Sequence, residues 1–254
     1  MDILLILAIL QARLSSSRLP GKVLKPILGK PMILLQIERV SRSKRINKLL
    51  IATSTDPSDD RIFDICTEHG IACFRGDLND VLDRFYQAAK TYKPRHIVRL
   101  TGDCPLIDSD VVDKVIELHL SGGFDYTSNT VERTFPKGLD VSIFTMQALE
   151  EAWREAYLSS QREHVTQFII SNSQRYKIGS YKNSIDLSSL RWTVDKELYF
   201  ILINKIYNAL YYKNLNFKTA DILALIEKHP ELKTLNVSCC HNDGLKKTTK
   251  SGEV

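Results

Sequence analysis

No run of apolar residues in this chain of 254 is long enough to cross a membrane. The clearest candidate, residues 3–10, falls far short of the roughly 20 residues that a spanning helix needs. It also lacks the basic segment and the small-residue cleavage site of a secretory signal. We therefore expect residues 3–10 to form a buried strand, and the protein to be cytoplasmic without membrane insertion.

Cysteine is scarce, and two common nucleotide-binding signatures are missing. The five cysteines show no C-x-x-C spacing, so neither a disulfide framework nor a paired zinc motif is indicated. Neither G-x-x-x-x-G-K-[ST] nor G-x-G-x-x-G occurs. These absences disfavour a P-loop enzyme and a dinucleotide-binding enzyme.

Positive charge is not concentrated in any segment, although the formal net charge is +5 at pH 7. Basic residues are accompanied by acids, as in Lys44, Arg45, Asp59, Asp60 and Arg61. A dense Lys/Arg stripe with interleaved aromatic residues, typical of a nucleic-acid surface, is absent. We interpret these charges as a solvated mixed surface, which argues against a nucleic-acid partner and leaves a modest preference for anionic small molecules.

Short apolar runs alternate with segments of helical spacing through the first half of the chain. Strands are predicted at residues 3–10, 49–53, 72–74 and 96–100, and helices at 32–42, 61–69, 81–92 and 111–120, the last capped by Ser109. Such alternation is typical of an α/β fold whose mostly parallel sheet carries helices on both faces.

The second half has a looser pattern. Strand-like pieces are predicted at residues 125–128, 139–144 and 176–181, and helices at 147–157, 163–172, 199–211 and 220–228. No linker rich in Pro, Gly or Ser divides the chain. We therefore expect a single domain over residues 1–243, followed by a polar, basic and disordered tail at 244–254.

The segment from Gln11 to Lys22 follows the first strand and is rich in groups that bind phosphate. It carries the cations Arg13, Arg18 and Lys22 and three consecutive serines. Ligands of open parallel sheets bind beyond the carboxyl ends of the strands, where backbone N–H groups, hydroxyls and cations can hold a polyphosphate. The alternative is a solvated basic loop that leads to the next helix, but its position after a buried strand favours a phosphate-binding loop.

Two acids follow extended segments elsewhere in the chain. Asp103 comes directly after the strand at 96–100, and Asp195 ends a second extended stretch at 190–195. Mg²⁺ takes one or two protein carboxylates and completes its shell with phosphate oxygens and water, so both acids can share one ion beside a nucleotide. Alternatively, Asp103 only shapes a turn and Asp195 caps a helix.

The ordered motifs of the chain resemble those of a known family. They are Gln11-Ala12-Arg13, Ser17-Arg18-Leu19-Pro20-Gly21-Lys22, Gly29-Lys30-Pro31-Met32, Ile51-Ala52-Thr53-Ser54, Leu100-Thr101-Gly102-Asp103-Cys104-Pro105, Gly138-Leu139-Asp140-Val141, Arg162-Glu163-His164-Val165-Thr166 and Arg191-Trp192-Thr193-Val194-Asp195. This series resembles the cytidylyltransferases that make CMP-activated sugars, including CMP-Kdo and CMP-sialic acid synthetases. The closest likeness is to the spore coat polysaccharide biosynthesis branch.

The resemblance implies a single-domain GT-A- or Rossmann-like nucleotidyltransferase fold and the transfer of CMP from CTP to a sugar. It implies that Asp103 and Asp195 bind Mg²⁺ and that Arg13 and Lys22 act in catalysis with them. The implied nucleotide-binding residues are Gln11, Ala12, Arg13, Ser17, Arg18, Lys22, Thr53, Ser54, Thr101 and Asp103.

For the acceptor sugar, the second half offers polar residues suited to a polyhydroxylated and acidic molecule. They are Asn129, Arg133, Lys137, Asp140, Arg162 and His164. His164 can be a general base, a hydrogen-bonding pocket residue or a structural histidine. The resemblance also implies a homodimer.

Two rival functions stay open. The acceptor can instead be a sugar or alditol phosphate, or the nucleotide another triphosphate. The chain can also be a nucleotide-binding regulatory protein without turnover, because it departs from the family pattern at Ser15, at Ser142 and after Asp195, where only Glu197 is nearby.

Overall fold

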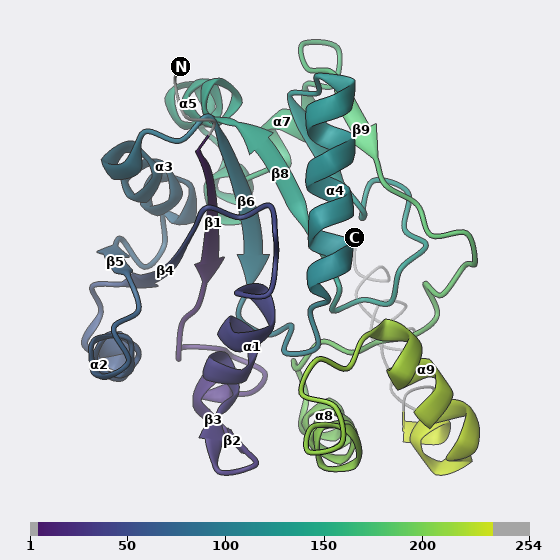
Figure 1. Ribbon diagram of the computed structural model, residues 1–254. Coiled ribbons are helices and arrows are strands. Elements are labelled where there is room, and N and C mark those ends of the chain that lie inside the picture. The colour runs from purple at the N-terminus through teal and green to yellow at the C-terminus, as the bar shows by residue number, and fades with distance from the viewer. Residues whose placement is uncertain (1–4, 236–254) are drawn as a thin grey trace, which may run out of the picture.

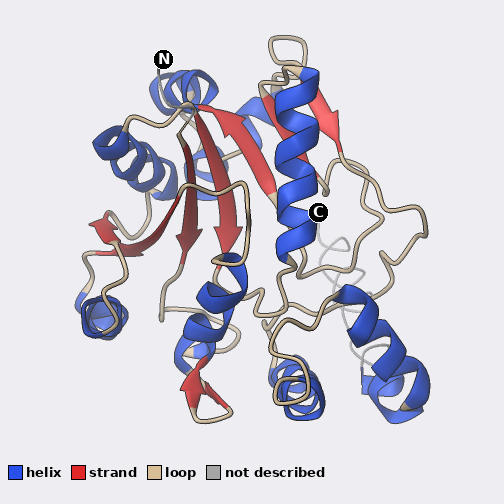
Figure 2. Ribbon diagram, in the orientation of Figure 1, coloured by secondary structure: helices blue, strands red, loops and turns tan. Residues whose placement is uncertain are grey.

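The computed structural model describes residues 5–235. Over these residues its centre is a seven-stranded sheet with helices packed around it (Figures 1 and 2). The strands of this sheet are β1 (Ile6–Gln11), β4 (Lys48–Ser54), β5 (Cys73–Gly76), β6 (His96–Thr101), β7 (Tyr126–Ser128), β8 (Ser142–Thr145) and β9 (Ile178–Ser180). Their spatial order is β5-β4-β1-β6-β8-β7-β9.

The predicted mostly parallel sheet is confirmed. Strands β5, β4, β1 and β6 are parallel neighbours, and β7 and β9 are also parallel. Within this seven-stranded sheet, as far as the described residues go, only the pairings of β8 with β6 and with β7 are antiparallel. Residues Ile6 to Leu10 of β1 are buried, as expected for a central strand that is covered on both faces.

Helices cover both faces of the sheet, as predicted (Figure 2). They are α1 (Met32–Val40), α2 (Asp60–Glu68), α3 (Val81–Tyr92), α4 (Ser109–Gly122), α5 (Met146–Glu155), α6 (Ser159–His164), α7 (Gln167–Ser171), α8 (Glu197–Leu210) and α9 (Thr219–Lys228). Alternate residues of β1 divide between two hydrophobic clusters. Ala8 and Leu10 pack with α1, α2, α4, α8 and α9, whereas Leu7 and Ile9 pack with α3, α5 and α7.

Several predicted bounds need correction. The sequence indicated one helix over residues 163–172, but the chain forms α6 and α7 with a break at Val165, whose φ is +55°. There the amide of Thr166 donates to the carbonyl of His164 at 2.5 Å, closing a tight turn. The helix α4 begins with Asp108 as its cap, since the Asp108 carboxylate accepts from the amide of Asp110 at 3.0 Å. The expected cap Ser109 is instead the first residue of that helix.

Two more differences concern residues that lead into or out of strands. The strand predicted at 139–144 begins only at Ser142. A short hairpin of β2 (Pro26–Ile27) and β3 (Lys30–Pro31), which the sequence did not suggest, joins the segment after β1 to helix α1. Its two turn residues, Leu28 and Gly29, both have positive φ, as a two-residue hairpin turn requires. The predicted tail at 244–254 lies outside the described residues.

Across residues 5–235, each helix is too short or too polar to span a bilayer.

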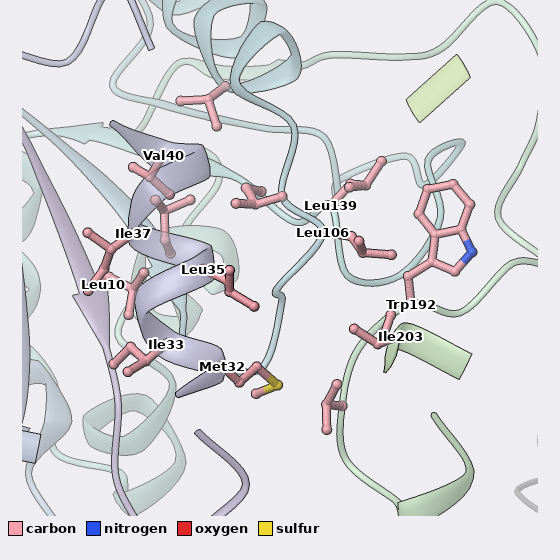
Figure 3. Packing of buried hydrophobic residues seen from close by; sticks show 14 of the residues in the cluster. Leu10, Met32, Ile33, Leu35, Ile37, Val40, Leu106, Leu139, Trp192 and Ile203 are labelled. Atoms are coloured by element: carbon pink, nitrogen blue, oxygen red, sulfur yellow. The ribbon is translucent and has the colours of Figure 1, made fainter. Parts of the chain in front are cut away.

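A close backbone contact joins two segments beyond the sheet. The amide of Trp192 donates to the carbonyl of Lys137 at 2.6 Å, and the amide of Lys137 donates to the carbonyl of Leu190 at 2.9 Å. The residue that follows Lys137 is Gly138, whose φ is +115°. A Cβ atom on this glycine would lie 2.6 Å from the backbone carbon of Trp192. Leu139 and Trp192 then enter the same hydrophobic cluster as Leu10 (Figure 3).

We expect Gly138→Ala to lower the free energy of unfolding by about 2–4 kcal/mol, because the new methyl group meets backbone atoms and the φ angle is unfavourable. Gly123→Ala is the matched control. Gly123 also has positive φ but has open space around its Cβ position, so its loss is expected to be about 1 kcal/mol. Equal losses in urea denaturation would show that the close contact at Gly138 is unimportant.

Candidate functional site

The carboxyl ends of β1 and β6 lie side by side and bring two predicted site segments together. In the parallel register, Gln11 at the end of β1 is opposite Thr101 at the end of β6. The amide of Gly102 donates to the carbonyl of Gln11 at 2.8 Å. A Cβ atom at Gly102 would lie 3.0 Å from that carbonyl oxygen and 3.1 Å from the Cβ of Ala12. Asp103 therefore emerges directly beside the loop of residues 11–22.

A cavity of about 450 Å³ opens at this edge of the sheet, and its volume falls in the range of small-molecule sites. Eleven of the residues predicted for the site line it: Gln11, Ala12, Arg13, Ser17, Arg18, Lys22, Thr101, Asp103, Lys137, Asp140 and His164. They come from the ends of two strands, from the loop of residues 11–22 and from the second half of the chain. The cavity thus unites most of the nucleotide and acceptor residues that the sequence suggested.

Lys22 and Asp103 form an ion pair inside the cavity. The Nζ of Lys22 lies 2.8 Å from Oδ2 of Asp103, and the two side chains are only 11% and 26% exposed. Burial acts to raise the pKa of Asp103, but the charge of Lys22 and hydrogen bonds from Lys22, Thr101 and Cys104 outweigh it and hold the pKa below its usual value. Asp103 is therefore an anion at neutral pH.

The second acid, Asp195, lies just outside the cavity lining. It is linked to two residues that do line the cavity, to Arg18 through its side chain and to Asp103 through the neighbouring backbone. Its Oδ2 accepts from Arg18 at 2.7 Å and also from Arg191. The neighbouring amide of Val194 donates to the carbonyl of Asp103 at 2.8 Å. The two acids predicted to share a metal thus lie on hydrogen-bonded segments.

The oxygen donors near Asp103 fit a hard cation. Oδ1 of Asp195 is buried and, within residues 5–235, has no hydrogen-bond partner. The described part of the chain contains no group of three or more His, Cys, Asp or Glu side chains of the kind that holds a metal on its own. Two carboxylates without a third ligand are typical of Mg²⁺ that is bound together with substrate phosphates.

Two predicted nucleotide residues lie beneath the loop and not in the cavity lining. Thr53 and Ser54 end strand β4 and are fully buried. The hydroxyl of Ser54 donates to the carboxylate of Asp59. Their burial outside the cavity lining is a feature that the sequence pattern alone does not reveal.

Two predicted acceptor residues likewise have contacts within the protein. Asn129 is fully buried; its amide group donates to the carbonyl of Leu139 at 2.7 Å and accepts from the amide of Val141 at 2.9 Å. These bonds hold the backbone on either side of Asp140. Arg162 donates to the carboxylate of Asp80 at 2.5–3.0 Å, and so joins α6 to the start of α3.

Of the remaining acceptor candidates, Lys137, Asp140 and His164 line the cavity, whereas Arg133 lies outside its lining and binds Asp140. Asp140 is held by a bidentate ion pair with Arg133, with N–O distances of 2.7 and 2.9 Å. Partial desolvation and the charge of nearby Arg191 hold the pKa of Lys137 below its usual value. Lys137 and Asp140 thus present opposite charges to a ligand from one short segment.

Sequence reasoning overlooked three charged residues in the cavity lining, Arg84, Arg99 and Glu163. The Nε of Arg99 donates to the side-chain oxygen of Gln11 at 3.1 Å, and Arg84 donates to the carbonyl of Asp77 at 2.6 Å. Burial lowers the pKa of both arginines. The sequence did contain a signal for the two arginines. Arg84 in α3 and Arg99 in β6 occupy positions that the apolar pattern of these elements assigns to the interior.

Glu163 lies close to the loop of residues 11–22. Its carboxylate lies 3.6 Å from the guanidinium of Arg13. Because both side chains are about half exposed, this pair is weak and leaves Arg13 available to a ligand.

Comparisons with known proteins agree on one family. A family model described as cytidylyltransferase matches residues 7–233. The chain is 34% identical over 194 residues to the spore coat polysaccharide biosynthesis protein SpsF of Bacillus subtilis, a match that spans 71% of this chain and 81% of that protein. A 113-residue stretch is 37% identical to the 3-deoxy-manno-octulosonate cytidylyltransferase of Pelobacter propionicus, spanning 44% of this chain and 43% of that one.

A solved structure is also similar over nearly the same range. A cytidylyltransferase from Leptospira borgpetersenii has a TM-score of 0.85 and 33% sequence identity, covering 89% of this chain and 95% of that chain. The predicted Rossmann-like nucleotidyltransferase fold is thereby confirmed.

Proposed function

The chain belongs to the cytidylyltransferase family, and from that premise we propose that it transfers CMP from CTP to a hydroxyl group of an acidic, ulosonic-type sugar, with release of pyrophosphate. The observation that carries this proposal is the meeting of Lys22 and Asp103 in a cavity at the ends of β1 and β6. There a cationic loop faces a carboxylate that stays ionised. A triphosphate with an associated divalent cation matches this charge arrangement.

The choice of an acidic sugar rests on residues of the second half of the chain that line the same cavity. Lys137 lines it together with His164, and a cation there complements a sugar carboxylate. The similar Pelobacter protein is named for the eight-carbon acid 3-deoxy-manno-octulosonate. We extend that substrate class, but no particular sugar, to this chain.

In the proposed reaction a sugar hydroxyl oxygen attacks the α-phosphorus of CTP. A new phosphorus–oxygen bond forms, the bond from the α-phosphorus to the oxygen bridging to the β-phosphate breaks, and pyrophosphate leaves with that electron pair. The hydroxyl proton passes to water or to His164. Arg13, Arg18 and Lys22 stabilise the negative charge that develops on the phosphate oxygens, so catalysis is mainly positioning and charge stabilisation.

We further propose that Asp103 and Asp195 hold Mg²⁺ with the triphosphate. When bound, this ion supplies charge neutralisation and increases the acidity of the attacking hydroxyl. The protein's own part is to present carboxylate oxygens: Oδ1 of Asp195 is buried and unpartnered within residues 5–235. Arg18 pairs with Asp195 and Lys22 pairs with Asp103, so the same two cations hold the side chains of both acids in place.

The test of the proposed function is a pyrophosphate-release screen of four nucleoside triphosphates against acidic, phosphorylated and neutral sugars. We expect turnover with CTP and an acidic ulosonic sugar. Turnover that requires a sugar phosphate, or that prefers another nucleotide, would contradict the proposal. Tight CTP binding without product under every acceptor would instead support a regulatory protein.

Asp103→Ala is expected to reduce kcat by at least about a hundredfold, because it removes a carboxylate at the reacting phosphates. The protein should stay folded, since Val194 and Thr193 bond to the backbone carbonyl of Asp103 and not to its side chain. Asp103→Asn removes the negative charge but keeps the shape of the side chain. Asp64→Ala, at an exposed position of α2, is the control. Undiminished turnover in either Asp103 variant, with circular dichroism unchanged, would remove Asp103 from the mechanism.

Lys22→Ala is expected to raise the KM for CTP by about tenfold or more and to change the KM for the sugar by less than about threefold, because an ion contact to phosphate is lost. Lys25→Ala is the matched control. Lys25 follows Lys22 by three residues but pairs with Glu197 and lies over the ring of Phe200. Steady-state kinetics with each substrate varied in turn separates the effects, and a larger change for the sugar would assign the loop to the acceptor.

A further inference from the structure

A buried carboxylate lies beneath the phosphate-binding loop. Asp59 ends the short 3₁₀ helix η2 (Pro57–Asp59) between β4 and α2, and it is 0% exposed. Its Oδ1 accepts from the backbone amide of Leu14 at 2.6 Å. Its Oδ2 accepts from both the amide and the hydroxyl of Ser54. The sequence suggested a solvated charge at this position, and that interpretation is wrong.

Leu14 is the point at which the loop closes on itself. Its carbonyl accepts from the amide of Ser16 at 2.8 Å and from the amide of Gly21 at 3.0 Å. The residues on either side of this closed turn are Arg13 and Lys22, two of the cations in the cavity lining. The amide of the same residue is the one that Asp59 holds. The Asp59 carboxylate therefore holds Leu14, whose carbonyl accepts the two hydrogen bonds that close the loop.

The buried charge also acts on the cavity wall. Burial lowers the pKa of Arg84, and the negative charge of Asp59 opposes that effect. Arg84 lines the cavity from α3 and is 1% exposed. A carboxylate is costly to bury without such partners, whereas a neutral side chain could have bonded to Leu14 at lower cost. The Asp59 carboxylate thus interacts with both the backbone of the loop and the guanidinium of Arg84.

We infer that Asp59 is a positioning residue, which sets the phosphate-binding loop through the amide of Leu14 and never contacts the substrate itself. The inference rests on the proposed function only in that the loop holds a polyphosphate. Neither the base of the nucleotide nor the acceptor sugar enters it. A probe without base or sugar, inorganic tripolyphosphate, therefore tests it directly.

The experiment measures the Kd for tripolyphosphate, and separately for CTP, by isothermal titration calorimetry in the presence of Mg²⁺. We expect Asp59→Ala to weaken both by about tenfold to a hundredfold, because a charge-assisted hydrogen bond is lost and the loop cations shift. Asp59→Asn keeps one oxygen for the Leu14 amide but turns an NH₂ group toward the Ser54 amide, so an intermediate loss is expected.

Asp56→Asn is the matched control. Asp56 caps the same short helix, accepting from the amide of Ser58 at 2.9 Å, and its side chain is not buried. Asparagine caps as well as aspartate, so both Kd values should stay within about twofold of wild type.

Hydrogen exchange separates positioning from general stability. If Asp59 sets the loop, the Leu14 amide exchanges faster in both Asp59 variants, while amides in β1 keep their protection at temperatures well below unfolding. Should Asp59→Ala fail to fold, Asp59→Asn decides alone: a weakened Kd with faster Leu14 exchange supports the inference. Wild-type Kd values in a folded Asp59 variant would overturn it, even if that variant unfolds at a lower temperature.

The outcomes remain distinct from those of the proposed function. If wild-type protein binds tripolyphosphate but releases no pyrophosphate from CTP with any sugar, the proposed function fails and the role of Asp59 is still decided by the variants. If wild-type protein binds no tripolyphosphate, the premise that the loop holds phosphate is overturned together with the inference.

Discussion

The parallel pairing of β1 with β6 is the constraint on which the candidate site depends. It sets Gln11 opposite Thr101, and the absence of a side chain at Gly102 lets the two strand ends meet through a hydrogen bond of 2.8 Å. From that contact the loop of residues 11–22 leaves one strand and Asp103 leaves the other. Their charges then meet as an ion pair in a shielded cavity, where electrostatic interactions are stronger than in water.

A second layer of contacts holds the residues that face the cavity. Asn129 fixes the backbone around Asp140, Arg162 joins α6 to α3, and Asp59 holds Leu14. Each of these side chains is engaged by the protein itself. Asn129 and Arg162 were predicted as ligand contacts because hydrogen-bonding residues are needed in both roles, whereas Asp59 was interpreted as a solvated charge.

The fold could be predicted from the sequence where burial follows a simple period. The apolar run of β1 and the spacing of Val81–Tyr92 each indicated the correct element. The break at Val165 could not be anticipated, because a β-branched residue at positive φ is held there by its surroundings against its own preference. For the site, the loop cations and Asp103 were identified because they follow strands. Thr53 and Ser54 end a strand as well, but only the packing of Asp59 beside them reveals that they are buried outside the cavity lining.

The contact between Gly138 and Trp192 joins two segments that are far apart in the sequence. This separation affects the order in which the candidate site is assembled during synthesis. A ribosome makes the cationic loop early, and the segment that pairs Asp195 with Arg18 emerges only after most of the chain has been synthesised. Pairings between such distant segments form late and slowly, because the intervening chain must first be ordered. A nascent chain therefore passes through a stage in which the loop of residues 11–22, Asp59 and Asp103 have been made while Asp195, the partner of Arg18, has not. The candidate site therefore gains its contact between Arg18 and Asp195 only once the last quarter of the chain has begun to emerge.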